Sequence, residues 1–180
     1  TSLDLSKNTA LKYLNSESNP VKNLDLSNNL LLKEVNCLGN GLTTLDVSKN
    51  TALEKLNCDN NQLETLDLSH NPALKTLDCD ANNLTSLDLS GNSVLTGLYC
   101  SFNRLNNLTI SGCDALQILV CIYNQLKNLD ASDKPLLRRV YCEQNGMTSL
   151  NISGVVRDAL DETRDVDAGR TGGLAGGLVA

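Results

Sequence analysis

The sequence predicts a β-rich solenoid, a right-handed coil of about seven 21-residue units with parallel strands and little helix. Two observations carry this prediction: a repeat of fixed length, and an alternation of apolar and polar residues inside each repeat. The 180 residues are 41% hydrophobic and only 3% aromatic. Such a composition suits one soluble domain with a sizeable core that is not built on large rings.

Two columns of identical residues define the repeat, where a column means the same position in successive units. Cysteines recur every 21 residues at Cys37, Cys58, Cys79, Cys100, Cys121 and Cys142. Asparagines follow three residues later at Asn40, Asn61, Asn82, Asn103, Asn124 and Asn145. One full unit extends from Leu53 to Ala73 and reads LEKLNCDNNQLETLDLSHNPA. A unit of this size cannot bury its apolar side alone, so neighbouring units must stack to make the core.

The two halves of the unit each predict an extended segment. Residues 55–59 alternate between polar and apolar side chains, which is the period of a short strand with one buried face. Residues 65–69 show the same alternation. A unit this short leaves little room for a helix between the two segments. We therefore expect a flattened coil with a parallel strand on one face and a second extended segment on the opposite face.

The unit is also nested, because its first half, LxxLxCxxN, is echoed by its second half, LxxLDLSxN. This pattern resembles the signature of the leucine-rich repeat family, LxxLxLxxN/CxL. More narrowly, it resembles the 21-residue nested class of bacterial secreted and cell-surface proteins. The resemblance covers about residues 1–155 and implies a leucine-rich repeat solenoid in a secreted or surface protein. It also implies that outward side chains of the main strand face bind a protein or a glycan.

The cysteine column replaces an inward leucine of the signature, which predicts a ladder of buried free thiols. A zinc site needs clustered spacings such as CxxC, and the sequence has none. We expect the asparagine column to turn inward and to hydrogen-bond backbone groups of adjacent coils. Cys113 lies in a different column and is interpreted as a drifted turn residue. That column otherwise holds Asn8, Asn29, Asn50, Asn71 and Asn92.

Two further polar columns complete the unit. A serine is present in all eight copies and is interpreted as a cap of the following turn: Ser6, Ser27, Ser48, Ser69, Ser90, Ser111, Ser132 and Ser153. An aspartate column is predicted to stack on one outer face: Asp4, Asp25, Asp46, Asp67, Asp88 and Asp130. Like charges one strand apart repel, so this column needs compensation. Hydrogen bonds from backbone or serine groups are the favoured source, and a calcium ion is the alternative.

The sequence does not predict catalysis. His70 is the one histidine, and its column otherwise holds Lys, Asn, Gly and Asp, which indicates an exposed turn. No Gly-rich phosphate loop lies between a strand and a helix. We therefore expect no catalytic residue, no metal site and no cofactor. The net charge of −6 argues against nucleic-acid binding, and the absence of any run of 18 apolar residues argues against membrane insertion.

The outward positions of the main strand change character along the chain. Early coils are mostly polar there, apart from Tyr13. Later coils place four of the five aromatic residues in two adjacent outward columns over three consecutive coils. The predicted ligand-binding residues are Tyr99, Phe102, Tyr123, Arg139 and Tyr141. The alternative is that these residues form a partly apolar end, covered by the tail or by further repeats.

The domain organisation follows from the repeat. Residues 1–155 form the repeat domain, and residues 156–180 form a C-terminal tail. Helical spacing of apolar side chains over 155–160 predicts a short helix that caps the last coil, followed by a Gly-rich disordered segment. The leading functional hypothesis is a non-enzymatic recognition module for a protein or a glycan. The alternatives are a structural spacer or adhesin stalk, and the accessory repeat region of a larger secreted hydrolase.

Overall fold

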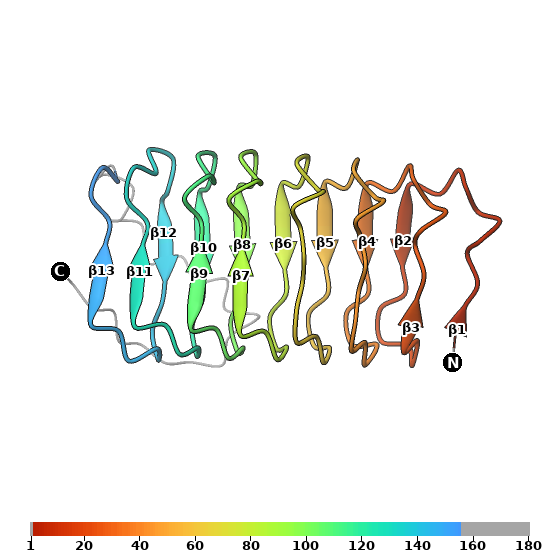
Figure 1. The fold of residues 1–180 in the computed structure, drawn as a ribbon, viewed down its shortest axis with the longest axis horizontal. Coiled ribbons are helices and arrows are strands. Elements are labelled where there is room, and N and C mark those ends of the chain that lie inside the picture. Colours follow the sequence, from red (N-terminus) through yellow and green to blue (C-terminus); the bar gives the residue numbers. More distant parts are fainter. Residues whose placement is uncertain (1, 156–180) are drawn as a thin grey trace.

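A computed structural model describes residues 2–155, which form a row of stacked coils (Figure 1). Seven strands, one from each coil, pair in parallel along one side of the row. They are β2 (Tyr13–Asn15), β4 (Glu34–Asn36), β5 (Lys55–Asn57), β6 (Thr76–Asp78), β8 (Gly97–Tyr99), β10 (Ile118–Val120) and β12 (Arg139–Tyr141). Paired residues are one unit apart, as Leu56 of β5 and Leu77 of β6 are.

A second set of shorter ladders lies on the opposite side of the coils. It comprises β1 (Ser2–Leu3), β3 (Asn23–Leu24), β7 (Ser86–Asp88), β9 (Asn107–Thr109), β11 (Asn128–Asp130) and β13 (Ser149–Asn151). These strands pair in parallel as β1–β3, β7–β9 and β11–β13. Residues 44–46 and 65–67 hold the corresponding positions of two coils without forming a strand. The second extended segment is therefore interrupted between β3 and β7.

The predicted fold class is confirmed. Residues 2–155 form a solenoid of parallel strands with about seven coils of 21 residues, and none of these residues is helical. The described part of the chain accordingly contains no helix with the length and apolar character that a bilayer crossing requires. The predicted tail, 156–180, with its capping helix, lies outside the described residues.

The core is a stack of leucine columns inside the coils. In the middle of consecutive strands, Leu56, Leu77 and Leu98 are buried and belong to one apolar cluster. Another fully buried column begins each unit: Leu32, Leu53, Leu74, Leu95, Leu116 and Leu137. Burial of one leucine stabilises the fold by roughly 1.5–3 kcal/mol. Each coil is thus held by its neighbours through its inward side chains, and the outward side chains are free of this packing constraint.

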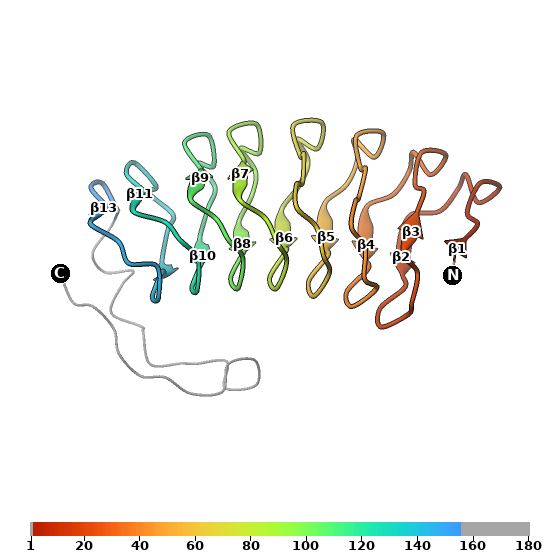
Figure 2. The same ribbon diagram turned by 60° about the horizontal axis from the view of Figure 1, so that its bottom comes forward.

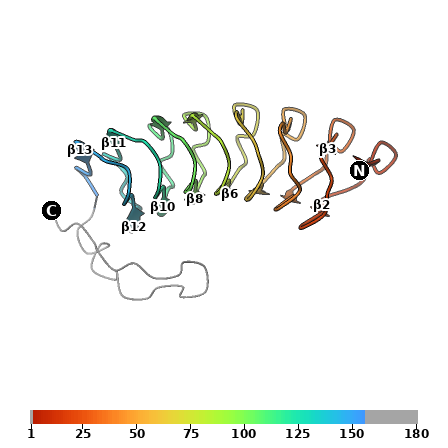
Figure 3. The ribbon, with the colours of Figure 1, turned by 90° about the horizontal axis from the view of Figure 1, so that it is seen from below.

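The row of coils bends gently, as Figures 2 and 3 show. The seven-stranded sheet lies along the inner side of the bend, and the second set of strands lies along the outer side. No helix formed by residues 2–155 covers either side. We use the name sheet face for the solvent side of the seven-stranded sheet together with the corner that follows each strand. The predicted binding residues lie on this surface.

Candidate functional site

The cysteine ladder lines the inward side of the sheet, with one thiol in each coil. Five of its six members are fully buried, and Cys142 is half-buried. All are free thiols, and Sγ of Cys37 donates to the Asn57 carbonyl of the next coil at 3.4 Å. Burial raises the pKa of the Cys37 thiol to about 12. The predicted ladder of buried free thiols is confirmed, with the partial exposure of Cys142 as the exception.

The asparagine ladder stabilises the corner that follows each strand through hydrogen bonds to the backbone. Nδ2 of Asn61 donates to the carbonyl of Cys37 in the preceding coil at 2.9 Å, and to that of Cys58 at 3.0 Å. Oδ1 of Asn61 accepts the N–H of Leu42 at 2.9 Å. The same bonds recur at Asn82, Asn103, Asn124 and Asn145. The side chain therefore supplies hydrogen bonds to backbone groups that the corner takes out of strand pairing.

A second asparagine ladder, which we expected to be only a turn column, lies towards the outer side of the coils. Its members are fully buried: Asn29, Asn50, Asn71 and Asn92. Nδ2 of Asn71 donates to the carbonyls of Val47 and Asn50 in the preceding coil, both at 3.0 Å. The signal was present in the sequence, because this column keeps asparagine through five units whereas the exposed turn column beside it varies.

Cys113 is the next member of this second ladder. It is fully buried, and its Sγ donates to the Leu89 carbonyl at 3.3 Å. Burial raises the pKa of the Cys113 thiol to about 11. The residue that we interpreted as a drifted turn residue is therefore a buried, neutral substitute for asparagine inside the coil. One coil further, buried Lys134 occupies the same column, and its Nζ donates to the Ser111 carbonyl at 3.2 Å.

Each aspartate of the aspartate column accepts a hydrogen bond within its own turn. Oδ1 of Asp67 accepts the N–H of Ser69 at 2.9 Å. The same bond recurs at Asp4, Asp25, Asp46, Asp88 and Asp130. Hydrogen bonds from the backbone and the hydroxyl of Ser69 lower the pKa of Asp67. The aspartate thus caps the turn, and the serine that we expected to be the cap is its donor. Among residues 2–155, no group of three or more His, Cys, Asp or Glu side chains is placed to hold a metal ion.

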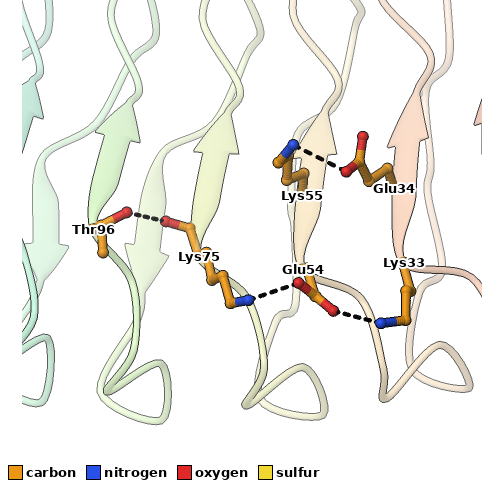
Figure 4. Close-up of polar contacts among 6 residues, drawn as sticks. All are labelled: Lys33, Glu34, Glu54, Lys55, Lys75 and Thr96. Atoms are coloured by element: carbon orange, nitrogen blue, oxygen red, sulfur yellow. Dashed lines mark hydrogen bonds and ion pairs between the residues drawn. The ribbon is translucent and has the colours of Figure 1, made fainter.

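The part of the sheet face from β4 to β6, called here the charged half, carries a ladder of ion pairs (Figure 4). Glu54 lies between two lysines, with Oε1 2.9 Å from Nζ of Lys33 and Oε2 2.7 Å from Nζ of Lys75. A second pair joins Lys55 to Glu34 at 2.9 Å. Hydrogen bonds from Lys75 and Lys33 lower the pKa of Glu54 to about 2. Because exposed ion pairs contribute little stability, their main effect is to keep this half hydrophilic.

The part from β8 to β12, called the aromatic half, holds a stacked pair of rings. The ring centroids of Phe102 and Tyr123 are 4.8 Å apart, and the ring planes are inclined by 16°. Phe102 is 50% exposed and Tyr123 is 40% exposed. The structure therefore brings these two predicted binding residues into direct contact on the surface.

The other three predicted binding residues lie nearby but do not join the stack. Tyr99 and Tyr141 share one column of the sheet, and Val120 lies between them. Arg139 is at the other end of the same three-residue strand as Tyr141. All three side chains are half-buried. The five predicted binding residues thus comprise one stacked pair of rings and three half-buried neighbours.

Both stacked residues adopt a left-handed backbone conformation. Their column, the corner after each strand, has φ between 49° and 67° in seven coils: Ser18, Gly39, Asn60, Ala81, Phe102, Tyr123 and Gln144. The N–H of Phe102 donates to the Ile122 carbonyl of the next coil at 3.0 Å, so the stacking of coils imposes this geometry. Bulky side chains are rare at positive φ, and such strain costs about 1–3 kcal/mol per residue. Glycine and asparagine elsewhere in the column were the sequence signal for this left-handed conformation.

Three aspartates, called the aspartate cluster, lie in the charged half on the side that borders the aromatic half: Asp59, Asp78 and Asp80. Asp78 is buried at the end of β6, in register with Tyr99 of β8. Oδ1 of Asp80 accepts the N–H of Ser101 at 2.5 Å. Asp59 holds the same column as Asp80, one coil earlier. The sequence did not single these residues out for binding, because only the stacking of coils brings the carboxylates together beside the aromatic half.

No protein-family model and no curated protein matches the sequence. Solved structures match most of its length. The functional domain of InlJ from Listeria monocytogenes, which includes a cysteine ladder, has a TM-score of 0.67 at 36% identity over 80% of this chain and 37% of that chain. The internalin InlF from Listeria monocytogenes has a TM-score of 0.71 at 22% identity, over 83% and 50% of the two chains. A chain of the LRIM1/APL1C complex has a TM-score of 0.64 at 24% identity, over 83% and 33%.

The chain spans between about a third and a half of the length of these three structures. The two structures below 25% identity share its fold, and the InlJ domain shares the cysteine ladder as well. These likenesses agree with the nested repeat, the parallel sheet and the inward ladders described above. The chain is a leucine-rich repeat protein, of the class that stacks coils of about 21 residues on a cysteine ladder.

Proposed function

We propose that the chain is a non-enzymatic recognition module that binds a partner protein at the aromatic half of its sheet face. The observation that carries the proposal is the exposed stack of Phe102 and Tyr123. Stacking contributes about 0.5–1.5 kcal/mol, which is less than the strain of about 1–3 kcal/mol that each residue bears at positive φ. Strain at positive φ therefore offsets what stacking itself contributes, whereas exposed aromatic side chains are the usual anchors of protein interfaces.

The neighbouring side chains fit the same role. Tyr99 and Tyr141 extend the apolar contact area, and Arg139 offers a cation for an acidic group of the partner. Tyrosine and arginine are enriched at binding hot spots. One of the similar structures is a chain in a complex of two proteins, which favours a protein over a glycan as the partner. The likeness to internalins supports a further proposal, that the chain belongs to a secreted or surface protein of a bacterium.

The test is a binding screen of the native chain against extracellular proteins, with a glycan array in parallel. The key variant combines Phe102→Asn and Tyr123→Asn, because asparagine already occupies the same corner at Asn60. We expect binding to a protein, weakened at least about tenfold in the double variant.

The matched control is Tyr13→Ala, which removes a ring that is 62% exposed at the far end of the same sheet. This change should leave the affinity unaltered. Binding that survives the double change, or that is confined to glycans, contradicts the proposal.

A further inference from the structure

We infer that the aromatic half binds an acidic segment of the partner protein, and that Arg138 and Arg139 pair with carboxylates of that segment. This inference rests on the proposed function and names the chemistry of the partner at the same site. A difference between the two halves carries it. The lysines of the charged half have glutamates in the adjacent coil, whereas these two arginines have neutral residues there.

Arg138 lies in the column that directly precedes the strands of the sheet. In the charged half this column holds Glu54 between Lys33 and Lys75, and both lysines pair with it (Figure 4). The N–H of Lys75 donates to the Glu54 carbonyl at 2.7 Å. The N–H of Arg138 makes the equivalent bond with the Gln117 carbonyl at 2.8 Å. The neighbour of Arg138 is therefore a neutral glutamine where the charged half has a glutamate.

Arg139 repeats the comparison in the next column, where each residue begins its strand. In the charged half, Lys55 is in register with Glu34 and pairs with it at 2.9 Å. Arg139 is in register with Ile118. Because side chains alternate along a strand and Val140 packs against the core, Arg139 faces the solvent side of the sheet. It has an apolar neighbour where Lys55 has an acid.

Acids elsewhere on the sheet face do not fill this role. The ion pairs that the structure shows among residues 2–155 all use lysines. Glu143 is the one carboxylate in the described sheet face from β8 to β12, and it lies at the corner beyond the far end of β12. Asp78 of β6 is three strands away from β12, or about 14 Å. That separation exceeds the screening length of about 8 Å at physiological ionic strength.

The choice of arginine points to carboxylates as well. Among residues 2–155, the one further arginine is Arg104, which follows Phe102 by two positions. The described arginines therefore all lie in coils of the aromatic half, within a chain of net charge −6. A guanidinium group forms two parallel N–H bonds with a carboxylate, whereas the ammonium of lysine acts as a point charge. The ion pairs of the charged half show that carboxylates fit these two columns.

The positions of the arginines and the rings define the length of the partner segment. Gln144, which holds the column of the stacked rings in the last coil, follows Arg139 by five positions. At about 3.3 Å per residue, the arginines and the ring column are at most roughly 16 Å apart along the strand direction. An extended segment therefore reaches both if its acidic and apolar side chains are about four or five residues apart.

The experiment measures binding of a synthetic acidic peptide to the whole chain. The probe is a heptapeptide with two glutamates at one end and two leucines at the other, separated by Ser-Gly-Ser. The control peptide carries glutamines in place of the glutamates. Anisotropy of the dye-labelled peptides gives the affinity, and ring-labelled ¹³C-phenylalanine reports contact with the stack, because Phe102 is the single phenylalanine. We expect a saturable Phe102 shift with the acidic peptide, about fivefold weaker binding of the glutamine peptide, and loss of this difference at high salt.

Two double variants with the same change in net charge locate the site. Arg138→Gln with Arg139→Gln should weaken the acidic peptide about fivefold and leave the glutamine peptide unaffected. Lys33→Gln with Lys55→Gln removes the same charge from the same two columns of the charged half and should alter neither affinity. Arg138→Lys with Arg139→Lys keeps the charge but loses the paired geometry, so the acidic peptide should bind with intermediate affinity.

A further variant supplies the acid from within the chain. Gln117→Glu places a carboxylate beside Arg138, as Glu54 lies beside Lys75 in the charged half. The acidic peptide should then bind about threefold more weakly, because one arginine is already paired. Gln62→Glu adds the same charge at an exposed position after β5 and should leave the affinity unaltered.

The acidic segment is refuted if the glutamine peptide binds equally well, if the affinity ignores Arg138 and Arg139, or if these arginines bind heparin and not the acidic peptide. Failure of the proposed function gives a different result. A partner protein that requires Phe102 and Tyr123 but tolerates the loss of both arginines refutes the acidic segment and keeps the recognition site. Acid-dependent binding of the peptide through the arginines, combined with partner binding that ignores the stacked rings, refutes the recognition site and keeps the acidic segment.

Discussion

The charged half and the aromatic half of the sheet face share the same inward columns of residues, called here the frame, but their outward side chains differ in character. Beneath both, the inward columns repeat with cysteine, asparagine and either leucine or valine. Above them, one half holds ion pairs around Glu54, and the other holds the stacked rings of Phe102 and Tyr123. Inward side chains are constrained by two neighbouring coils, whereas outward side chains meet solvent. The comparison teaches that the stacking of coils constrains only the inward columns, so the outward columns can vary and serve recognition.

The largest expected effect comes from the shared frame. Leu77→Asp places a carboxylate in the fully buried centre of β6. An unpaired buried charge costs several kcal/mol, so cooperative thermal unfolding should be lost. Thr76→Asp, at the outward neighbour in the same strand, should shift Tm by a few degrees at most. Circular dichroism melting curves make this comparison, and an unchanged Tm for Leu77→Asp would show that the inward register is wrong.

The second effect compares how much the frame contributes to the free energy of unfolding beneath each of the two halves. Asn61→Leu lies under the charged half, and Asn103→Leu lies under the aromatic half. Each change leaves buried backbone groups of two coils without their side-chain partner. We expect each to lower the free energy of unfolding by about 2–4 kcal/mol in urea titrations. A difference above about 1 kcal/mol between the two variants would contradict a uniform frame.

The third effect exchanges the corner residues of the two halves. Phe102→Asn relieves strain at positive φ and should raise the free energy of unfolding by about 0.5–1 kcal/mol. Asn60→Phe introduces the same strain in the charged half and should lower it by about 1 kcal/mol. Urea unfolding of both variants measures whether each change raises or lowers the free energy of unfolding. If Phe102→Asn is destabilising instead, the ring serves the stability of the chain, and the argument for binding is weakened.

The smallest effect is the pH response of the charged half. Hydrogen bonds from Lys75 and Lys33 lower the pKa of Glu54 from 4.5 to about 2. A carboxylate with a lowered pKa stabilises the fold above its ordinary pKa, and this contribution is lost as the pH falls from about 4.5 to about 2. Glu54→Gln should therefore lower Tm slightly at pH 7 and leave it unchanged at pH 2. A difference in Tm that is the same at both pH values would assign the effect to packing and not to ionisation.

The frame could be predicted from the sequence because inward positions have few solutions. The space around Cys58 and Asn61 is set by the coils before and after, so residue type and period are enough to place them. The Phe102–Tyr123 stack depends on side-chain direction at a corner with positive φ, which no periodicity reports. The second asparagine ladder has the same spacing as a turn column, and only the constancy of asparagine over five units separates it from the variable turn column beside it. The proximity of the aspartate cluster to the rings likewise arises only when coils stack.

The asparagine ladders have a consequence for how such a chain grows. Their bonds between coils join residues 19 to 24 positions apart. The separation along the chain is therefore the same however many coils are present, and relative contact order falls as coils are added. Duplicating the coding sequence of one unit adds a coil whose bonding partners already exist in its neighbours. Evolution can lengthen or shorten this kind of protein one coil at a time, and each added coil brings a new strip of surface that selection can shape independently of the frame.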